Sequence, residues 1–344
     1  MAMKAAVFTG IRTIEIQQVP TPTPKPDEVL IRVRAAGVCG SEVHAFLGTH
    51  PFRKPPAIMG HEVAGDVVEV GADVRSFKPG DRVLVEPQVS CGRCLYCRSG
   101  DYHLCLSKVM LGVPAWPGAF GEFITAPERT LLRLPDGFSY EEGAMVEPLA
   151  VGVHSARKAR VQVGESALVL GAGPIGLCCI AAARAAGATR IVATDAYDFN
   201  LELARKMGAA GVVNVRRGDD LARVVADQVR PEGVDATFVT AGFSPVFNQS
   251  LAHTRKAGRV ALVALFDEPI TIPEPFLIGG KELEVIGVHT YIRKDFETAI
   301  DLIRSGAVDV KAMITHVLPM EEAQRALELV HGKTEDNAKV ILRF

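Results

Sequence analysis

Short apolar strands alternate with helical segments between residues 166 and 263 of this chain of 344 residues. The first strand is the continuous apolar run at 166–170, and a helix follows it through Ala186. Further strands are expected at 189–194, 212–215, 236–240 and 259–263, with helical periodicity at 199–207. Parallel strands need a crossover connection, which is usually a helix. The alternation therefore predicts βαβ units, a parallel sheet and a doubly wound α/β domain.

A glycine-rich turn separates the first strand from the first helix. Its sequence is Gly171-Ala172-Gly173-Pro174-Ile175-Gly176, which has the spacing G-x-G-x-x-G. The first glycine permits a tight turn, the second lets the backbone approach a pyrophosphate, and the third lets helix and strand pack closely. The same spacing also occurs in turns of other α/β domains, so the motif by itself leaves a purely structural turn open.

An acidic residue at the end of the next strand supports a dinucleotide site. Asp195 lies 19 residues after Gly176, where a ribose-binding carboxylate belongs. It would accept hydrogen bonds from both ribose hydroxyls and repel a 2′-phosphate, which favours NAD over NADP. Arg190 lies on the wrong side of the strand end to offset this repulsion, and Arg205 is a helical turn too far along.

The N-terminal part of the chain has a different pattern. Residues 4 to about 150 contain short β-rich segments bounded by Pro and Gly, at 29–33, 67–71 and 81–85. Prolines at every second position from Pro20 to Pro26 exclude a helix there. Two helices, at 296–303 and 321–330, and a strand at 338–342 are expected near the C-terminus. The pattern predicts a β-rich, barrel-like domain.

Composition limits the partners and the location that we expect. The length suits roughly two domains, and 48% hydrophobic with 23% charged residues is ordinary for a globular protein. A formal charge of −2 gives no electrostatic reason to expect nucleic acid or an anionic membrane. There is no signal-like apolar stretch near Met1 and no apolar run of membrane-spanning length. We therefore expect a cytoplasmic protein with reduced thiols.

Four of the seven cysteines form a cluster with the spacing C-x2-C-x2-C-x7-C, namely Cys91, Cys94, Cys97 and Cys105. Zn²⁺ accepts four thiolates tetrahedrally, so the cluster predicts a closed structural zinc site. Disulfides would be strained at a spacing of three residues and do not suit a reducing location. An iron–sulfur cluster of the ferredoxin type would need a gap of three residues and a proline after the last cysteine, whereas Leu106 follows here.

A second, sparser set of residues could hold zinc with one position left open. Cys39, His61, Glu62 and Glu147 offer a thiolate, an imidazole and two carboxylates. Three protein ligands leave a fourth position for water or substrate, as in catalytic zinc sites. These residues are far apart in the sequence, and an isolated Cys or His is more often a packed or surface residue. The spacing alone therefore does not show whether these residues form a zinc site.

The segment Gly60-His61-Glu62-x-x-Gly65, with Gly71 and Val74 after it, resembles the zinc signature of the medium-chain dehydrogenase/reductase superfamily. The Cys39 motif, the four-cysteine lobe, the Glu-Pro segment at Glu147 and the glycine-rich loop follow in the family's order. The resemblance implies a GroES-like catalytic domain at 1–152 and 291–344, with a structural zinc lobe at about 88–106. It also implies a Rossmann NAD-binding domain at 153–290.

The same resemblance implies roles for individual residues. Cys39 and His61 would be catalytic zinc ligands, with Glu62 and Glu147 as alternatives for the third protein position. Ser41 and His44 match the family's proton-relay positions. Cofactor contacts are implied at Gly171, Gly173, Pro174, Ile175, Gly176, Asp195, Val263, Leu265 and Gly287.

Two departures from the family pattern, and three residues of cleft-lining segments, bear on specificity. Classical alcohol dehydrogenases have Cys where this chain has Glu147, whereas the sorbitol, xylitol and butanediol dehydrogenase branch has a carboxylate. Asn200 stands where many relatives have Arg. Trp116, Phe120 and Arg53 fall in segments that line the substrate cleft in relatives, although core packing would also explain Trp116 and a solvated loop charge would explain Arg53.

These features predict a zinc- and NAD-dependent dehydrogenase that oxidises a secondary alcohol of a polyol or sugar-like substrate to a ketone. Each chain would hold one catalytic and one structural zinc ion. The alternatives are an L-threonine 3-dehydrogenase or a 2,3-butanediol-type dehydrogenase and, in another class, a non-catalytic NAD-binding structural protein. The resemblance also implies a homodimer or homotetramer joined through the Rossmann sheet edge near residue 285.

Overall fold

The computed structural model describes residues 2–344 of the chain. Contacts between residues divide it into two units. The first contains the residues up to Glu147 together with Ile314–Phe344, and the second is Pro148–Met313. The domain limits expected from the sequence, 152/153 and 290/291, stay a prediction about functional domains; residues 291–313 group with the second unit by contacts.

The second unit is built on a parallel sheet of six strands in the order β13-β12-β11-β14-β15-β16. The strands are β11 (Ser166–Leu170), β12 (Arg190–Asp195), β13 (Gly211–Asn214), β14 (Val234–Val239), β15 (Thr254–Leu262) and β16 (Glu284–Gly287). All residues of β11 and β14 are buried, as expected of central strands covered on both faces. This sheet confirms the predicted doubly wound α/β class.

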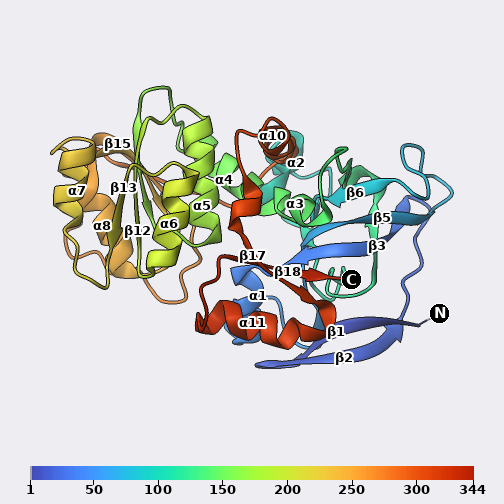
Figure 1. The fold of residues 1–344 in the computed structure, drawn as a ribbon. Helices are drawn as coiled ribbons and strands as arrows, with labels where there is room; N and C mark the ends of the chain where they lie inside the picture. Colours follow the sequence, from blue (N-terminus) through green and yellow to red (C-terminus); the bar gives the residue numbers. More distant parts are fainter. Residues whose placement is uncertain (1) are drawn as a thin grey trace. The chain divides into compact units, whose positions relative to one another are not determined.

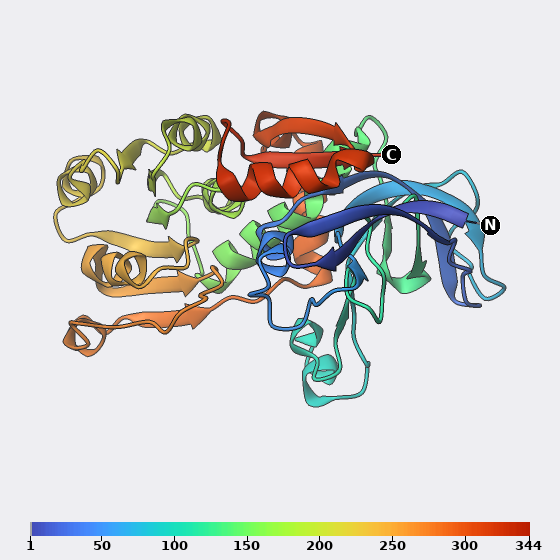
Figure 2. The ribbon, with the colours of Figure 1, turned by 90° about the horizontal axis from the view of Figure 1, so that it is seen from below.

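Helices cover both faces of this sheet (Figures 1 and 2). The helices are α4 (Val146–Lys158), α5 (Pro174–Ala185), α6 (Asp198–Met207), α7 (Leu221–Gln228), α8 (Ser244–His253), α9 (Phe276–Gly280), α10 (Arg293–Arg304) and the 3₁₀ turn η3 (Val310–Met313). Local sequence explains several of their ends. Asp220 caps α7 by accepting from the Arg223 amide at 3.1 Å, and Gly208 ends α6 in a left-handed conformation.

Strand order reverses beside β11 in this sheet. β12 and β13 lie on one side of β11, and β14, β15 and β16 lie on the other. Ligands of open α/β sheets bind outside the carboxyl ends of the strands at such a switch point. The glycine-rich turn after β11 and Asp195 at the end of β12 both lie at this edge.

The first unit is mainly β-structure, as predicted. Three sheets have the orders β2-β1-β4, β10-β6-β5-β3-β18-β17 with β9 also paired to β3, and β7-β8. The strands are β1 (Ala2–Gly10), β2 (Thr13–Pro20), β3 (Glu28–Gly37), β4 (Ala57–Ile58), β5 (Glu62–Val70), β6 (Arg82–Val85), β7 (Gln88–Val89), β8 (Val109–Met110), β9 (Phe123–Pro127), β10 (Leu131–Arg133), β17 (Ile314–Pro319) and β18 (Lys339–Arg343).

Short helices lie between the strands of this unit. They are α1 (Gly40–Phe46), α2 (Leu95–Arg98), η1 (Tyr102–Leu104), η2 (Glu128–Thr130), α3 (Tyr140–Ala144), η4 (Met320–Glu322) and α11 (Ala323–Gly332). The core joins strand residues such as Phe8 and Ile31 to Phe46 of α1 and Leu327 of α11. The helices α1, α3 and, in the second unit, α4 were not predicted from the sequence.

The last strand of the chain belongs to the sheet that contains β3 and β5. β18 inserts between β3 and β17, so the C-terminal strand lies beside an N-terminal one (Figure 1). The proline-rich stretch after β2 has no helix, as expected. Among residues 2–344, no helix is both long enough and apolar enough to cross a membrane.

Candidate active site

Strand register brings Cys39 and His61 together. β3 and β5 are antiparallel, with Gly37 at the end of β3 opposite Glu62 at the start of β5. The residues just after β3 therefore lie close to the residues just before β5. Donor atoms of Cys39, Glu42 and His61 all lie within 4.8 Å of one another. Residues 22 positions apart thus form one cluster because a single pair of strands is in this register.

Glu42 links the two predicted ligands from the first turn of α1. Its Oε2 accepts from the Cys39 backbone amide at 3.0 Å, and its Oε1 lies 2.6 Å from Nδ1 of His61. Burial alone would raise the pKa of Glu42, but His61 and Arg53 outweigh it and lower the pKa to about 2. The carboxylate is therefore ionised and can accept Nδ1–H of His61, so Nε2 is the ring nitrogen that would bind a metal.

Arg53 is buried beneath this cluster and is 3% exposed, so it is not the solvated loop charge that the sequence suggested as one alternative. Its Nη1 donates to Glu42 Oε1 at 2.8 Å and to Ser41 Oγ at 2.7 Å. A guanidinium buried in this way needs an anionic partner, and Glu42 provides it. Arg53 thereby connects the predicted relay residue Ser41 to the residue that orients His61.

Two carboxylates face the other side of His61. Donor atoms of His61, Glu62 and Glu147 lie within 4.8 Å of one another, and all three residues are buried. Glu62 forms an ion pair with Lys339 of β18, which is 1% exposed. Burial would lower the pKa of Lys339, but Glu62, Cys39 and Glu147 outweigh it and raise the pKa. Lys339 is therefore a buried cation that holds Glu62.

This donor set fits a zinc ion. One thiolate, one imidazole and carboxylate oxygens suit Zn²⁺, and the carboxylate hydrogen bond to the distal nitrogen of His61 is the usual support of a metal-bound histidine. The cluster also concentrates buried acidic groups around His61 that a divalent cation would neutralise. Cys39, His61 and either Glu62 or Glu147 would be the residues that hold it.

The four cysteines of the lobe also converge. Cys91, Cys94, Cys97 and Cys105 place their sulfur atoms within 4.8 Å of one another. The Cys94–Cys97 and Cys91–Cys97 sulfur distances are 3.4 and 3.9 Å. Tetrahedral zinc–thiolate bonds of about 2.3 Å require sulfur separations of about 3.8 Å, whereas a disulfide would need about 2.05 Å. The geometry fits a closed zinc site, and all seven cysteines are free.

The electrostatics of the lobe also call for a cation. Backbone amides of Cys97 and Leu106 lower the pKa of the Cys94 thiol to about 6. Burial and hydrogen bonds from the neighbouring thiols raise the pKa of Cys97 to about 11. Four sulfurs this close cannot all ionise by themselves, because each thiolate opposes the next. A bound divalent cation would remove that conflict.

The glycine-rich turn has the geometry of a phosphate-binding loop. Gly171 has a φ of 106°, and a Cβ on Gly176 would lie 1.8 Å from the Gly171 carbonyl oxygen. A Cβ on Gly173 would meet no atom within 4 Å, so this position faces open space at the N-terminus of α5. Pro174 and Ile175 begin that helix. The free space and the helix N–H groups fit a pyrophosphate.

Asp195 lies beside this turn. Its Oδ2 accepts from the Ala172 amide at 2.8 Å, and its Oδ1 accepts from the Tyr197 amide at 3.0 Å and from Asn200 Nδ2 at 3.1 Å. Asn200, at the position where many relatives have Arg, therefore orients the acidic residue. The fit to a dinucleotide is good, because the carboxylate and the pyrophosphate turn share one edge of the sheet.

The other predicted cofactor residues also lie at this edge. Val263 and Leu265 follow β15, and Gly287 ends β16 opposite Leu262 of β15. Among the predicted relay residues, Ser41 contacts Arg53, and His44 Nδ1 lies 3.3 Å from Thr49 Oγ1. Trp116 and Phe120 belong to the core, and the Trp116 indole donates to the Thr125 carbonyl at 2.7 Å.

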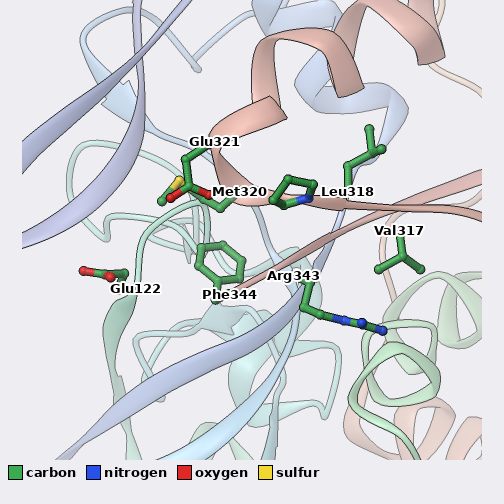
Figure 3. Close-up of a pocket in the computed structure, with 8 residues that line it drawn as sticks. Glu122, Val317, Leu318, Met320, Glu321, Arg343 and Phe344 are labelled. Atoms are coloured by element: carbon green, nitrogen blue, oxygen red, sulfur yellow. The ribbon is translucent and has the colours of Figure 1, made fainter.

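A cavity of about 400 Å³ lies elsewhere in the first unit, around the end of the chain (Figure 3). Its lining residues are Glu122, Val317, Leu318, Pro319, Met320, Glu321, Arg343 and Phe344. Its charged side chains Glu321 and Arg343 are paired with Lys4 and Glu141. None of the predicted ligand or cofactor residues lines it, so this cavity is not the candidate site.

Two residues of the cluster, Glu42 and Lys339, were not predicted, although each has a signal in the sequence. Glu42 stands three positions after Cys39, the capping-box spacing, and the two do form one in the structure. Lys339 is the single charge of the apolar segment expected as a strand at 338–342, which indicates a buried ion pair. Arg53 was named from the sequence as a residue of a cleft-lining segment or a solvated loop charge, and no local pattern indicated its contacts with Ser41 and Glu42.

Comparison with known proteins agrees with this geometry. The alcohol dehydrogenase GroES-like domain matches residues 25–136, and the zinc-binding dehydrogenase model matches residues 174–305. The chain is 39% identical to a sorbitol dehydrogenase of Bacillus subtilis (strain 168), over 95% of this chain and 93% of that protein. It is 38% identical to an L-idonate 5-dehydrogenase of Vitis vinifera, over 91% of this chain and 86% of that protein.

A solved structure extends the likeness to three dimensions. A zinc-binding dehydrogenase from Sinorhizobium meliloti 1021, bound to NADP, superposes with a TM-score of 0.93 at 30% identity and full coverage of both chains. A two-part fold with a thiolate–imidazole–carboxylate cluster and a dinucleotide turn defines a metal-dependent oxidoreductase. The chain belongs to the zinc-binding alcohol dehydrogenase family of medium-chain dehydrogenases. The resemblance noted from the sequence is therefore confirmed, as is its implication of an enzyme with zinc and a nicotinamide cofactor.

Proposed function

We propose that this enzyme oxidises a secondary hydroxyl of a polyol or sugar-like substrate to a ketone, with hydride transfer to NAD. The observation that carries the proposal is that His61 belongs to two groups of close donor atoms, one with Cys39 and Glu42 and one with Glu62 and Glu147, so that a carboxylate can complete the candidate metal site. Relatives named for sorbitol and for L-idonate oxidation support a polyhydroxylated substrate. The domain at 153–290 would bind NAD, and the rest of the chain would carry the catalytic residues.

Each residue of the candidate site has a distinct proposed role. Cys39, His61 and Glu147 would hold the zinc ion, because Lys339 already forms an ion pair with Glu62. Glu62 remains the alternative third ligand. When bound, zinc supplies Lewis-acid activation of the substrate hydroxyl. Ser41 and His44 carry the released proton towards solvent, and Arg53 fixes the Ser41 hydroxyl through its 2.7 Å hydrogen bond.

A substrate panel tests this function. Zinc-loaded enzyme is assayed for NADH formation with sorbitol, xylitol, galactitol, L-idonate, 2,3-butanediol and L-threonine. We expect kcat/KM to be highest for a polyol or sugar acid and at least tenfold lower for threonine. Activity confined to threonine or to 2,3-butanediol would reject the polyol assignment. Absence of turnover with every substrate, despite two bound zinc ions, would favour a non-catalytic NAD-binding protein.

We further propose a homo-oligomer assembled through the edge of the parallel sheet. β16 is an edge strand of that sheet, and Val285 on it is 40% exposed. An exposed edge with an apolar side chain readily pairs with another strand. We also propose a cytoplasmic location, because the lobe requires four reduced thiols.

A further inference from the structure

The ribose-binding edge carries a cation in the loop after β13. β12 and β13 are parallel neighbours, and Asp195 pairs in register with Asn214. The loop after Asn214 therefore runs beside the carboxylate that would bind the adenosine ribose. Arg216 and Arg217 are the second and third residues of that loop.

Arg216 is held in place although it is exposed to solvent. Its guanidinium lies 4.3 Å from the ring centroid of Tyr197, and its Nη2 donates to the Tyr197 hydroxyl at 3.1 Å. Asn214 Oδ1 accepts from the Arg216 amide at 2.9 Å, which fixes the loop backbone. Tyr197 is tied to Asp195 in turn, because its amide donates to Asp195 Oδ1 at 3.0 Å. The cation and the acidic residue are thus connected through one tyrosine.

The charge of Arg216 is not neutralised by a protein carboxylate. Within residues 2–344, no Asp or Glu lies at ion-pair distance from it, and only Nη2 of its guanidinium has a hydrogen-bond acceptor. Arg217, by contrast, pairs with Asp198 at 3.1 Å and with Asp219 at 3.6 Å. The remaining donors of Arg216 can therefore receive an anion in bidentate fashion.

The other arginines near β12 are not placed to bind an anion beside Asp195. Arg190 begins β12, at the opposite end of the strand from Asp195, and its Nη1 donates to the Val229 carbonyl at 3.4 Å. Arg205 lies in the last turn of α6. Asp195 itself accepts three internal hydrogen bonds, which compensate part of its charge.

We propose that Arg216 receives the 2′-phosphate of NADP, so that this enzyme binds both nicotinamide dinucleotides and Asp195 and Arg216 together set the preference between them. The inference rests on the cofactor part of the proposed function. Asp195 accepts from the ribose hydroxyls of NAD. Arg216 would hold a phosphate on the 2′-oxygen, because its guanidinium lies over Tyr197 in the loop that follows the register partner of Asp195.

Nucleotide fragments test this site independently of any alcohol substrate. Calorimetry measures the Kd of adenosine 2′,5′-bisphosphate and of 5′-AMP for the wild-type enzyme, Arg216→Ala and Arg217→Ala. We expect Arg216→Ala to weaken the bisphosphate by about tenfold or more, as for loss of a charge-assisted hydrogen bond. Its affinity for 5′-AMP should change by less than about threefold. Arg217→Ala removes the same charge one residue away, so both affinities should stay near those of the wild type.

A second pair of variants tests the interplay with Asp195. Asp195→Asn should strengthen bisphosphate binding, and the double variant Asp195→Asn/Arg216→Ala should lose that gain. Equal effects of Arg216→Ala and Arg217→Ala, or a wild-type enzyme that binds 5′-AMP but no bisphosphate, would overturn the inference and leave the proposed function standing. Failure to bind either nucleotide would overturn both.

Discussion

At the scale of single residues, Glu42 joins the two predicted ligands Cys39 and His61 of the candidate metal site. One carboxylate connects the Cys39 amide, the His61 imidazole and the Arg53 guanidinium. Glu42 is fully buried, so solvent does not screen the effect of its charge on these neighbouring groups. The positions of Cys39 and His61 therefore depend on Glu42, which would not need to contact zinc itself.

Replacing Glu42 should weaken zinc binding at this site. Glu42→Gln removes the charge that holds Nδ1–H of His61, so we expect zinc affinity there to fall by about 10- to 100-fold. Chelator competition followed by metal analysis measures this loss, and the zinc of the four-cysteine lobe should be unaffected. Glu142→Gln is the matched control, because Glu142 is a buried capping-box residue of α3. Equal zinc loss in both variants would contradict the role of Glu42.

At the scale of elements, we propose that the cysteine lobe would hold the structural zinc ion and the cluster beside α1 the catalytic one. A closed tetrathiolate has no vacancy for a substrate, so the lobe braces the loop at 91–105. Chemistry belongs to the open site, which is assembled where β3 ends and β5 begins.

Variants of single cysteines should separate these two roles. Cys94→Ala should leave one zinc per chain, lower the Tm and expose the loop at 91–105 to proteases, because the metal is its main source of order. Cys39→Ala should abolish turnover and keep the lobe zinc and a Tm near the wild-type value. Cys178→Ala, in the buried face of α5, is the control and should retain both metals. The same loss of Tm for Cys39→Ala and Cys94→Ala would refute this division.

The amino ends of the central strands are joined by a second buried carboxylate, Asp235 of β14. It accepts from Ser166 Oγ of β11 at 2.6 Å and from Arg255 Nε of β15 at 2.7 Å, and it forms an ion pair with Arg230. Burial alone would raise the pKa of Asp235, but these donors lower it to about 2. The network therefore couples three neighbouring strands by charge as well as by backbone hydrogen bonds.

This network predicts a dependence of stability on pH. The pKa of Asp235 in the folded state is below its unfolded value of about 3.9. The contribution of Asp235 to the free energy of unfolding is therefore complete above about pH 5, and it is lost as the pH falls from about 4 to 2. Asp235→Asn should lower the free energy of unfolding by about 2 kcal/mol at pH 7. Denaturation at several pH values should show that the difference in free energy of unfolding between the wild type and this variant decreases below about pH 4. Asp227→Asn, an exposed carboxylate of α7, should show no such gap.

At the scale of the whole molecule, the unpaired edge of the parallel sheet predicts self-association. β16 presents a row of backbone groups with Val285 outward, so a second copy can extend the sheet across that edge. Val285→Asp should shift the enzyme to monomers in light-scattering chromatography. Val163→Asp, at an 88% exposed loop position before β11, should leave the assembly intact. A wild-type enzyme that is already monomeric would reject the proposed assembly.

Much of the fold could be predicted from local patterns. The alternation of apolar strands with helices defines the parallel sheet, and the glycine spacing with Asp195 defines the dinucleotide edge, because these signals lie within short stretches of chain. The helices α1, α3 and α4 were missed. Their segments are short or contain Gly and Pro, and packing stabilises them more than intrinsic propensity does.

The sequence by itself determined the ligand types, the tetrathiolate lobe and the pyrophosphate turn, because each is encoded by residue chemistry at fixed spacing. Only the tertiary structure decided that Arg53 and Lys339 are buried cations beside the candidate metal site and that Arg216 stands over Tyr197. Those contacts depend on the register of β3 with β5 and β18 and of β12 with β13. Register joins residues from distant segments, and no local pattern of the chain reports the electrostatic partners that it creates.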